Sequence, residues 1–399
     1  MSAGSTAAAS SPAAAPAGKP QRLLSLDAFR GITILGMILV NNPGSWAPGY
    51  RYAPLDHAAW HGWTPTDFVF PFFLFIVGAS LSYSLRKYRD GDQVAPAVYV
   101  RIVRRAVVLF LLGVGLALFG NAWDYASGAK PTMGLDTLRI LGVLQRIALV
   151  YLVASLIVLH MRLRGQLALA AAILLGYWAC LAWLPDRGDH ASNLSPQGNF
   201  VRVVDLAVLG ANHMYTQAAE EQTEPEGLLS TLPAIVTALM GYWSGLVIQQ
   251  QGAAWRTVTT LAAGGLLAAA VGLAWDQAFP INKKLWTSSF VLFTGGLGMI
   301  GLGLCLGLFD VARWRRLAHA LAVVGVNAIT VFVGAGLLGR VLESTKVGAL
   351  TTQDWLFARG FTDHIQDPKL ASLGFALCCV AFWWLVAWLM SLRGWAIRV

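Results

Sequence analysis

The chain has 399 residues, of which 56% are hydrophobic and only 12% are charged. That charged share is about half of what a soluble domain carries, and apolar runs long enough to cross a bilayer recur along the chain. The composition excludes a soluble globular protein and predicts an all-α polytopic membrane protein. The net charge of +9 does not indicate nucleic-acid binding, because the basic residues are spread over short connecting segments.

The first twenty residues are mainly Ala, Ser, Pro and Gly and contain no apolar core of a signal peptide. We predict a disordered tail over residues 1–20 and one transmembrane domain over residues 21–399. The first membrane helix is then expected to direct insertion.

Hydropathy predicts about ten membrane spans. They lie near residues 23–42, 65–85, 103–121, 137–159, 166–184, 228–249, 256–275, 286–309, 317–339 and 370–392. Lys and Arg concentrate in alternate connections, whereas most acids fall in the others, which predicts that both termini are cytoplasmic. The connection that carries His57 then lies on the outer, periplasmic-like side.

The most informative motif, HAAWHGWTPTDFVFPFFLFIVG, runs from residue 57 to residue 78. It places His57, His61 and Asp67 directly before a membrane span, where ionisable groups are costly and therefore indicate a functional site. Trp60 and Trp63 alone would be typical of an interfacial aromatic belt, which is the alternative interpretation. Thr64-Pro65 is a helix-start signal.

A metal site is not predicted. His57 and His61 have the i, i+4 spacing of a helical zinc pair, but the glutamate of the HExxH motif is replaced by alanine and no third ligand is evident.

The first span has polar groups at both ends. Asp27 and Arg30 are three residues apart on one helical face, and the span ends at Asn41 and Asn42. The charged pair either serves the functional site or anchors the helix end at the interface.

The fourth span is predicted to carry Arg139 and Arg146 on one face. If the helix begins at Thr137, Arg146 lies roughly 13 Å deep. A buried guanidinium needs a carboxylate or a ligand phosphate as acceptor. The alternative is a structural ion pair with Asp27 or Asp67.

PINKKLWTSSF, from residue 280 to residue 290, places Lys283 and Lys284 on the predicted outer side, against the positive-inside pattern. The alternative is an interfacial lysine pair with Trp286 as a belt residue. Asn327 is predicted to lie in the middle of the ninth span, as an interhelical or a ligand contact.

Six blocks together resemble the heparan-α-glucosaminide N-acetyltransferase family, in particular its bacterial relatives. They are SLDAFRG, MILVNNPG, the motif from residue 57 to residue 78, GVLQRIALVY, PINKKLWTSSF and GVNAIT. The resemblance implies transfer of the acetyl group of cytosolic acetyl-CoA to the amine of a terminal glucosamine across the membrane. His57 matches the family's catalytic histidine in HAxWNG, His61 replaces the motif's Asn, and Asn41 matches the family's asparagine.

The residues agree with this chemistry. Neutral imidazole can serve as general base or transient acetyl carrier, so His57 is the predicted catalytic group. An amide such as Asn41 can donate to the oxyanion, and Asp67 can orient His57. Predicted acceptor-binding residues are Asn42, Trp60, His61, Lys283 and Trp286.

Basic residues are predicted to hold the phosphates of coenzyme A. They are Arg30, Arg104, Arg105 and Arg146; Arg104 and Arg105 have the alternative role of setting topology. The resemblance also implies a bacterial inner-membrane protein, a glycan acceptor and a homodimer. The competing interpretation is an amino-sugar transporter, which would also place polar residues within the membrane.

Overall fold

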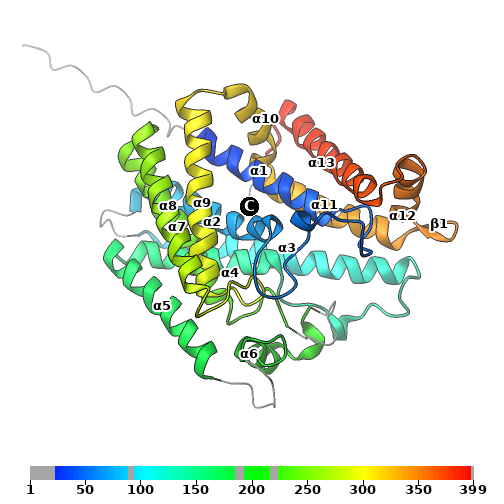
Figure 1. Cartoon of the computed structure of the whole chain (residues 1–399), viewed down its shortest axis with the longest axis horizontal. Helices are drawn as coiled ribbons and strands as arrows, with labels where there is room; N and C mark the ends of the chain where they lie inside the picture. Colours follow the sequence, from blue (N-terminus) through cyan, green and yellow to red (C-terminus); the bar gives the residue numbers. More distant parts are fainter. Residues whose placement is uncertain (1–22, 89–93, 185–192, 216–222, 397–399) are drawn as a thin grey trace, which may run out of the picture.

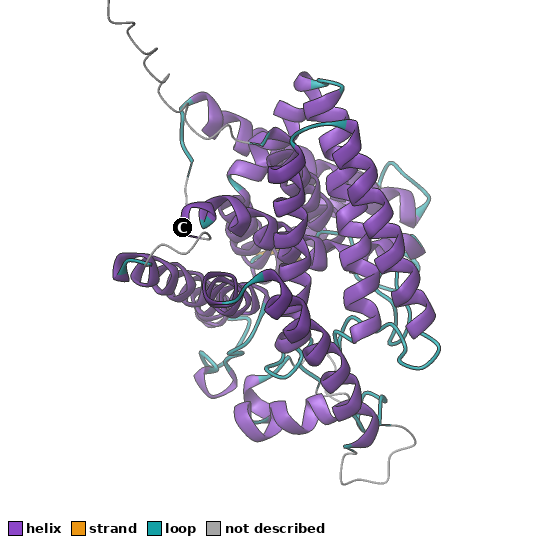
Figure 2. Cartoon of the chain, turned by 90° about the vertical axis from the view of Figure 1, so that its left-hand side faces the viewer, coloured by secondary structure: helices purple, strands orange, loops and turns teal. Residues whose placement is uncertain are grey.

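The structure is a computed structural model that describes residues 23–88, 94–184, 193–215 and 223–396 (Figure 1). The predicted N-terminal tail lies outside these residues. The regular structure of the described residues is helical (Figure 2), apart from one hairpin of β1, Lys346–Val347, and β2, Leu350–Thr351. The all-α fold class is therefore confirmed.

Nine helical segments in the described ranges are long and apolar enough to cross a membrane. They are α1 (Leu24–Asn41), the 3₁₀ turn Pro65–Phe68 with α2 (Val69–Ser84), α3 (Pro96–Ala126), α4 (Val143–His160), α5 (Leu163–Trp183), α7 (Thr231–Gln251), α8 (Trp255–Trp275), α9 (Ser288–Cys305, continued by a π turn to Val311) and α13 (Pro368–Leu392). A bent pair, α10 (Arg315–Val326) and α11 (Ala328–Ser344), gives a tenth candidate. Two shorter helices, α6 (Phe200–Leu209) and α12 (Thr352–Phe357), lie in the connections.

Helix α7 lies at the centre of the bundle and α3 at its edge. Of the most apolar stretch of each helix, 83% is buried in α7 and 22% in α3. Helices α2 and α7 approach closely at two glycines: a Cβ at Gly78 would lie 1.7 Å from the Ala238 carbonyl oxygen, and one at Gly241 would lie 1.8 Å from that of Phe75. Small residues allow this backbone contact within a membrane, so the crossing fixes α2 against α7.

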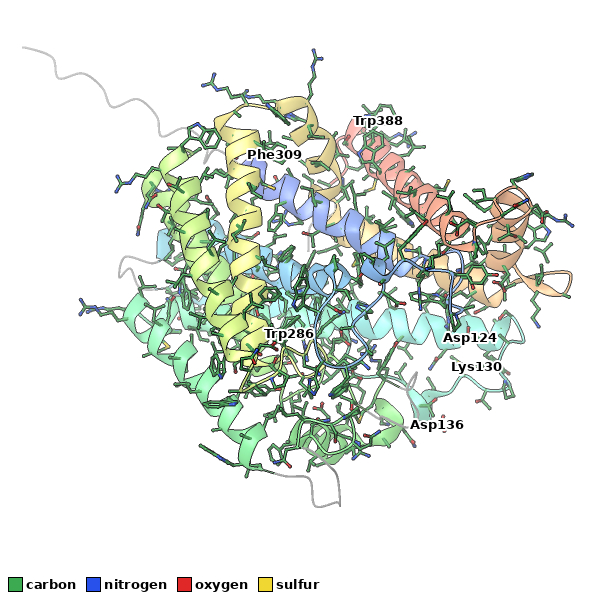
Figure 3. All side chains as sticks on the ribbon, viewed as in Figure 1. Asp124, Lys130, Asp136, Trp286, Phe309 and Trp388 are labelled. Carbon is green, nitrogen blue, oxygen red and sulfur yellow. The ribbon has the colours of Figure 1, made fainter. Side chains whose placement is uncertain are left out.

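Helices α8 and α9 run side by side (Figure 1). Figure 3 shows Trp286 at one end of α9 and Phe309 at the other. The segment that enters α9 therefore brings the motif from residue 280 to residue 290 to one end of the bundle.

The ninth predicted span is not one straight helix. Its two parts, α10 and α11, are bent by 63°. At the break the Asn327 N–H bonds to the Val324 carbonyl three residues earlier, at 3.1 Å, in place of a helical bond to the fourth residue. Gly325 packs against α1 so closely that a Cβ would lie 1.9 Å from the Asp27 carbonyl oxygen. Asn327 therefore lies at a helix junction.

The predicted start of the fourth span at residue 137 was wrong, because α4 begins at Val143. Gly142 is fully extended, with φ −164° and ψ −170°, and the Ile140 N–H bonds to the His213 carbonyl at 3.2 Å. Arg139 therefore precedes the helix, and Arg146 lies in its first turn and not deep within the span.

Candidate active site

Asp67 lies in the 3₁₀ turn Pro65–Phe68 that leads into α2, as the Thr64-Pro65 signal predicts. Its Oδ2 atom accepts the backbone N–H groups of Thr64, at 3.0 Å, and of Ala58, at 3.1 Å. The side chain is only 1% exposed. Because the carboxylate holds two points of the preceding loop, it fixes the position of His57.

His57 is bound directly to this carboxylate. Its Nδ1 atom lies 2.6 Å from Asp67 Oδ1. A carboxylate accepts and does not donate, so the proton belongs on Nδ1 and Nε2 carries the lone pair. The His57 side chain is 47% exposed. The imidazole is therefore oriented and accessible, as a general base or a nucleophile requires.

The turn before α9 is built by Asn282. Its side chain accepts the Leu285 N–H at 2.9 Å, and its own N–H donates to the Thr287 hydroxyl at 3.0 Å. The Gly62 N–H donates to the Ile281 carbonyl at 2.8 Å. The turn is thus bonded to the loop that carries His57.

This turn presents Lys283 to His57. The Lys283 Nζ atom lies 3.1 Å from His57 Nδ1, 3.4 Å from His57 Nε2 and 3.5 Å from Asp67 Oδ1. Burial lowers the pKa of Lys283, and the charges of Asp67 and Glu226 offset this only in part. Residues far apart in the sequence therefore form one cluster of Asp67, His57 and Lys283.

A cavity of about 590 Å³ begins at this cluster and continues along α1 and α2. Of the residues predicted for the site, the following line it: Arg30, Asn41, His57, Trp60, Asp67, Arg105 and Lys283. We call the part at His57, Asp67 and Lys283 the histidine end. The part at Ser84, Arg105 and Tyr151 is the arginine end. Since the 3₁₀ turn and α2 together run from Asp67 to Ser84, the two ends are roughly 25 Å apart along this segment.

The two neighbouring asparagines have different positions. Asn41 ends α1 and lines the cavity. The Asn42 amide donates to the Ile38 carbonyl at 2.8 Å and so closes the end of the helix. Of the two, Asn41 is placed to reach a ligand in the cavity.

Trp60 and His61 also differ. Trp60 lines the cavity, and its indole N–H donates to the Leu194 carbonyl at 2.8 Å. His61 does not line it among the described residues; its Nδ1 atom lies 3.4 Å from the Asn282 amide nitrogen. Burial lowers the pKa of His61. His61 therefore supports the turn that carries Lys283.

Arg30 reaches across the bundle. Its guanidinium bonds to Asp27 at 3.0 Å, to the Ser80 hydroxyl at 2.7 Å and to the Gly325 carbonyl at 3.4 Å. These contacts join α1 to α2 and α10. Arg30 therefore bonds to neighbouring helices and also lines the cavity.

The arginine end opens towards a second pocket of about 380 Å³. Ser84, Arg105 and Tyr151 line both spaces, and Arg104 lines the second one alone. The Arg105 guanidinium lies 4.8 Å from the centre of the Tyr151 ring, and its buried Nε has no hydrogen-bond partner within the described part of the chain. Such a donor suits an anionic ligand group.

Arg146 and Trp286 pack together away from the cavity. Arg146 is fully buried and donates to the Gly227 carbonyl and the Ser230 hydroxyl, so neither Asp27 nor Asp67 is its partner. Its guanidinium lies 5.1 Å from the centre of the Trp286 ring. Trp286 is 1% exposed, which excludes a belt position. Neither residue lines the cavity as the described residues form it.

Sequence reasoning missed one wall of the histidine end. Arg139, Tyr215 and Glu226 line it. Arg139 pairs with Glu224, where the Nε bond is 3.0 Å long, and with Glu226 at 2.6 Å. Burial opposes ionisation of Glu226, but nearby cations outweigh it and lower its pKa. Only the acids of this connection were visible in the sequence, and their spacing gave no signal for Arg139 as the partner.

Comparison with known proteins agrees with the motifs. Heparan-alpha-glucosaminide N-acetyltransferase of Homo sapiens is 27% identical over 363 residues, which cover 79% of this chain and 53% of that protein. The Mus musculus protein of the same name is 27% identical over 365 residues, 79% of this chain and 54% of its own length. The chain thus spans about half the length of these relatives, and the expected resemblance is confirmed. The family model described as a domain of unknown function (DUF5009) matches residues 22–256, so the chain belongs to that family.

Proposed function

We propose that the protein is a membrane N-acetyltransferase that moves the acetyl group of acetyl-CoA to the amine of a glucosamine-type sugar. The observation that carries the proposal is the single cavity that joins an arginine end to the oriented His57. A long donor with an anionic end and a reactive thioester at the other matches these two chemistries. The names of the two relatives support the same reaction class.

The histidine end supplies groups for acyl transfer. His57 Nε2 can remove the proton of the attacking amine or carry the acetyl group itself. Asp67 holds the tautomer and stabilises the imidazolium that forms. The Asn41 amide is our choice for the donor to the developing oxyanion.

The arginine end supplies groups for binding the donor. Arg105 is half-buried, with an unpaired Nε among the described contacts, and Arg30 and Arg104 lie along the same path. Charge-assisted bonds from these guanidinium groups to the phosphates of coenzyme A would leave the pantetheine arm to follow the cavity towards His57.

We further propose that the arginine end faces the cytoplasm and the histidine end the periplasm of a bacterial inner membrane. The test uses a background without the four native cysteines. Ala211→Cys, exposed near the histidine end, should react with an impermeant thiol reagent added outside intact cells. Ala97→Cys, exposed at the start of α3, should react only after lysis. The opposite pattern would reverse the proposed sidedness.

A specific observation favours the second candidate, an amino-sugar transporter. Many transporters place interrupted helices at the substrate site, and the α10–α11 break lies beside cavity-lining Gly325 and Ala328. The clustered Asp67, His57 and Lys283 support the enzyme instead, because acyl transfer requires an oriented imidazole that is accessible from the cavity.

Proteoliposomes separate the two candidates. With acetyl-labelled coenzyme A on one side and glucosamine on the other, the enzyme should yield labelled N-acetylglucosamine without net movement of free glucosamine. Glucosamine flux that needs no acetyl-CoA, together with no acetylated product, would replace the enzyme with the transporter.

A further inference from the structure

Lys283 places a primary amine where the proposed reaction needs the amine of its acceptor. Its Nζ atom lies within 3.1 Å and 3.4 Å of the two ring nitrogens of His57. Because the imidazole proton is on Nδ1, Nε2 is the nitrogen that can accept a proton, and it lies 3.4 Å from Nζ. This contact is expected to shorten in the reacting complex, as catalytic hydrogen bonds do when substrate is bound. The Lys283 side chain is 21% exposed and lines the cavity that would hold the thioester.

We propose that Lys283 is itself acetylated by the protein when no acceptor amine is present. The inference rests on the proposed acetyl-transfer function. The neutral Lys283 amine attacks the acetyl carbon of acetyl-CoA, and a C–N bond forms while the C–S bond breaks. His57 takes the proton from Nζ and returns it to the departing thiolate, so the products are an acetamide and free coenzyme A. If acetyl-His57 forms first, the same amine takes the acetyl group from it and the C–N bond to the imidazole breaks.

The surroundings of Lys283 make this amine reactive. Burial lowers its pKa, so the neutral nucleophile is available at a lower pH than for an ordinary lysine. The charged and titratable groups around it are His57 and Asp67 from the α2 entry, Glu226 from the segment before α7, and Lys284 from its own turn. The two carboxylates favour the ammonium form and Lys284 opposes it. Burial outweighs the carboxylates, so the pKa of Lys283 lies below its ordinary value.

Acetylation would stop turnover. An amide nitrogen carries no positive charge, so the contact with Asp67 at 3.5 Å would be lost. The added acetyl group would also occupy the histidine end, and an amide does not pass its acyl group on. Lys283 would therefore make activity depend on the supply of acceptor relative to acetyl-CoA.

The test is site-resolved mass spectrometry of the purified full chain after incubation with isotopically labelled acetyl-CoA and no acceptor. Lys284 is the matched internal control, since it also lines the cavity but places its Nζ over the Trp60 ring, 5.2 Å from the ring centre. We expect at least tenfold more label on Lys283 than on Lys284. The label should fall on addition of glucosamine and disappear in His57→Ala. The excess over Lys284 should persist when the pH is lowered to 7.

Lys283→Arg keeps the charge and should carry no label at this position. For the unmodified chain we expect activity to fall slowly during incubation with acetyl-CoA alone, and whatever activity Lys283→Arg retains should not fall in this way. Equal labelling of the two lysines, or labelling of Lys283 that survives His57→Ala, would mean non-enzymatic acetylation and overturn the inference. Acetylated glucosamine with an unlabelled Lys283 would overturn the inference but leave the proposed function intact. A labelled Lys283 with no acetylated sugar would keep the inference and reject the sugar acceptor.

Discussion

The two ends of the cavity are built in opposite ways. At the histidine end the ionisable groups are bound to one another: Asp67 holds His57 at 2.6 Å, and Lys283 lies within 3.5 Å of both. At the arginine end Arg105 has an unpaired buried Nε among the described residues, and the space shares three lining residues with a second pocket. A preorganised cluster suits chemistry, whereas an unsatisfied cationic donor suits binding of an anion.

The comparison also separates neighbouring residues of the same type. Asn41, His57 and Arg105 line the cavity, while Asn42, His61 and Arg104 do not line it in the part of the chain that the structure describes. In each pair, substitution of the residue that lines the cavity is the test, and the same substitution of the other residue is the control. The following predictions use these pairs to test whether the two ends differ in function.

The largest effect is expected at His57. General acid–base catalysis contributes about 10²–10⁴-fold, so His57→Ala should lower kcat for acetyl transfer by about 10³-fold. His61→Ala should keep most of the activity, because His61 faces the Asn282 turn. Purified variants are compared by product formation and by elution as a single species. A His61→Ala enzyme as impaired as His57→Ala would remove the distinction on which the histidine end rests.

Asn41→Ala should be the next most damaging change. Loss of one oxyanion donor costs about 10²-fold or more in kcat, with little change in the KM for acetyl-CoA. Asn42→Ala removes only the bond to the Ile38 carbonyl, so it should affect the thermal midpoint more than the rate. A defect of Asn41→Ala that appears only in KM would show that Asn41 binds substrate and does not stabilise the transition state.

At the arginine end the effect should appear in binding. A charged hydrogen bond is worth about 1.5–3 kcal/mol, so Arg105→Gln should weaken coenzyme A binding by about tenfold or more. Arg104→Gln, at an exposed position, should weaken it less. Affinity is measured by calorimetry on folded, detergent-purified protein. The topology of such protein is already set, so an effect of Arg104 or Arg105 on topology does not enter the measured affinity. Equal affinities in both variants and the unmodified protein would leave the nucleotide site unassigned.

The smallest effect concerns Asp205, a buried residue of α6 whose Oδ1 atom accepts the Leu228 N–H at 2.8 Å. Burial raises its pKa to about 7, from 3.8, so the fold favours the protonated form. The resulting stability is complete below pH 3.8 and is lost as the pH rises through about 7. The thermal midpoint should therefore fall between pH 5 and pH 8, and Asp205→Asn should reduce that fall by a few degrees. The exposed Asp363→Asn is the control, and an unchanged fall in Asp205→Asn would exclude Asp205 as its cause.

Much of the fold was predictable because a bilayer demands it. Backbone groups in lipid must bond internally, so each long apolar run becomes a helix. The predicted spans therefore correspond to helices in the structure. Details that depend on packing could not be predicted from hydropathy. The break at Asn327 depends on the contact of Gly325 with α1, and the late start of α4 depends on bonds from residues 139 and 140 to distant loops.

For the site, the sequence indicated which residues could carry the chemistry but not which residues each of them contacts. The motif at residue 57 indicated an Asp67–His57 pair, since both lie in one short segment that ends in a helix start. Glu226 and Arg139 could not be found in this way. Their 87-residue separation is bridged only in the folded chain.

Hydropathy and motifs alone were enough to predict an all-α membrane protein, polar residues clustered at residue 57 and at residue 283, and a resemblance to an acetyltransferase family. The contact of Lys283 with His57, the place of Arg105 in the same cavity, and the position of Arg146 and Trp286 outside its described lining became known from the folded chain. The physical reason is that hydropathy and local spacing act along the chain. The direction of a side chain depends on helix crossings such as Gly78 against Ala238, which involve residues far apart in sequence.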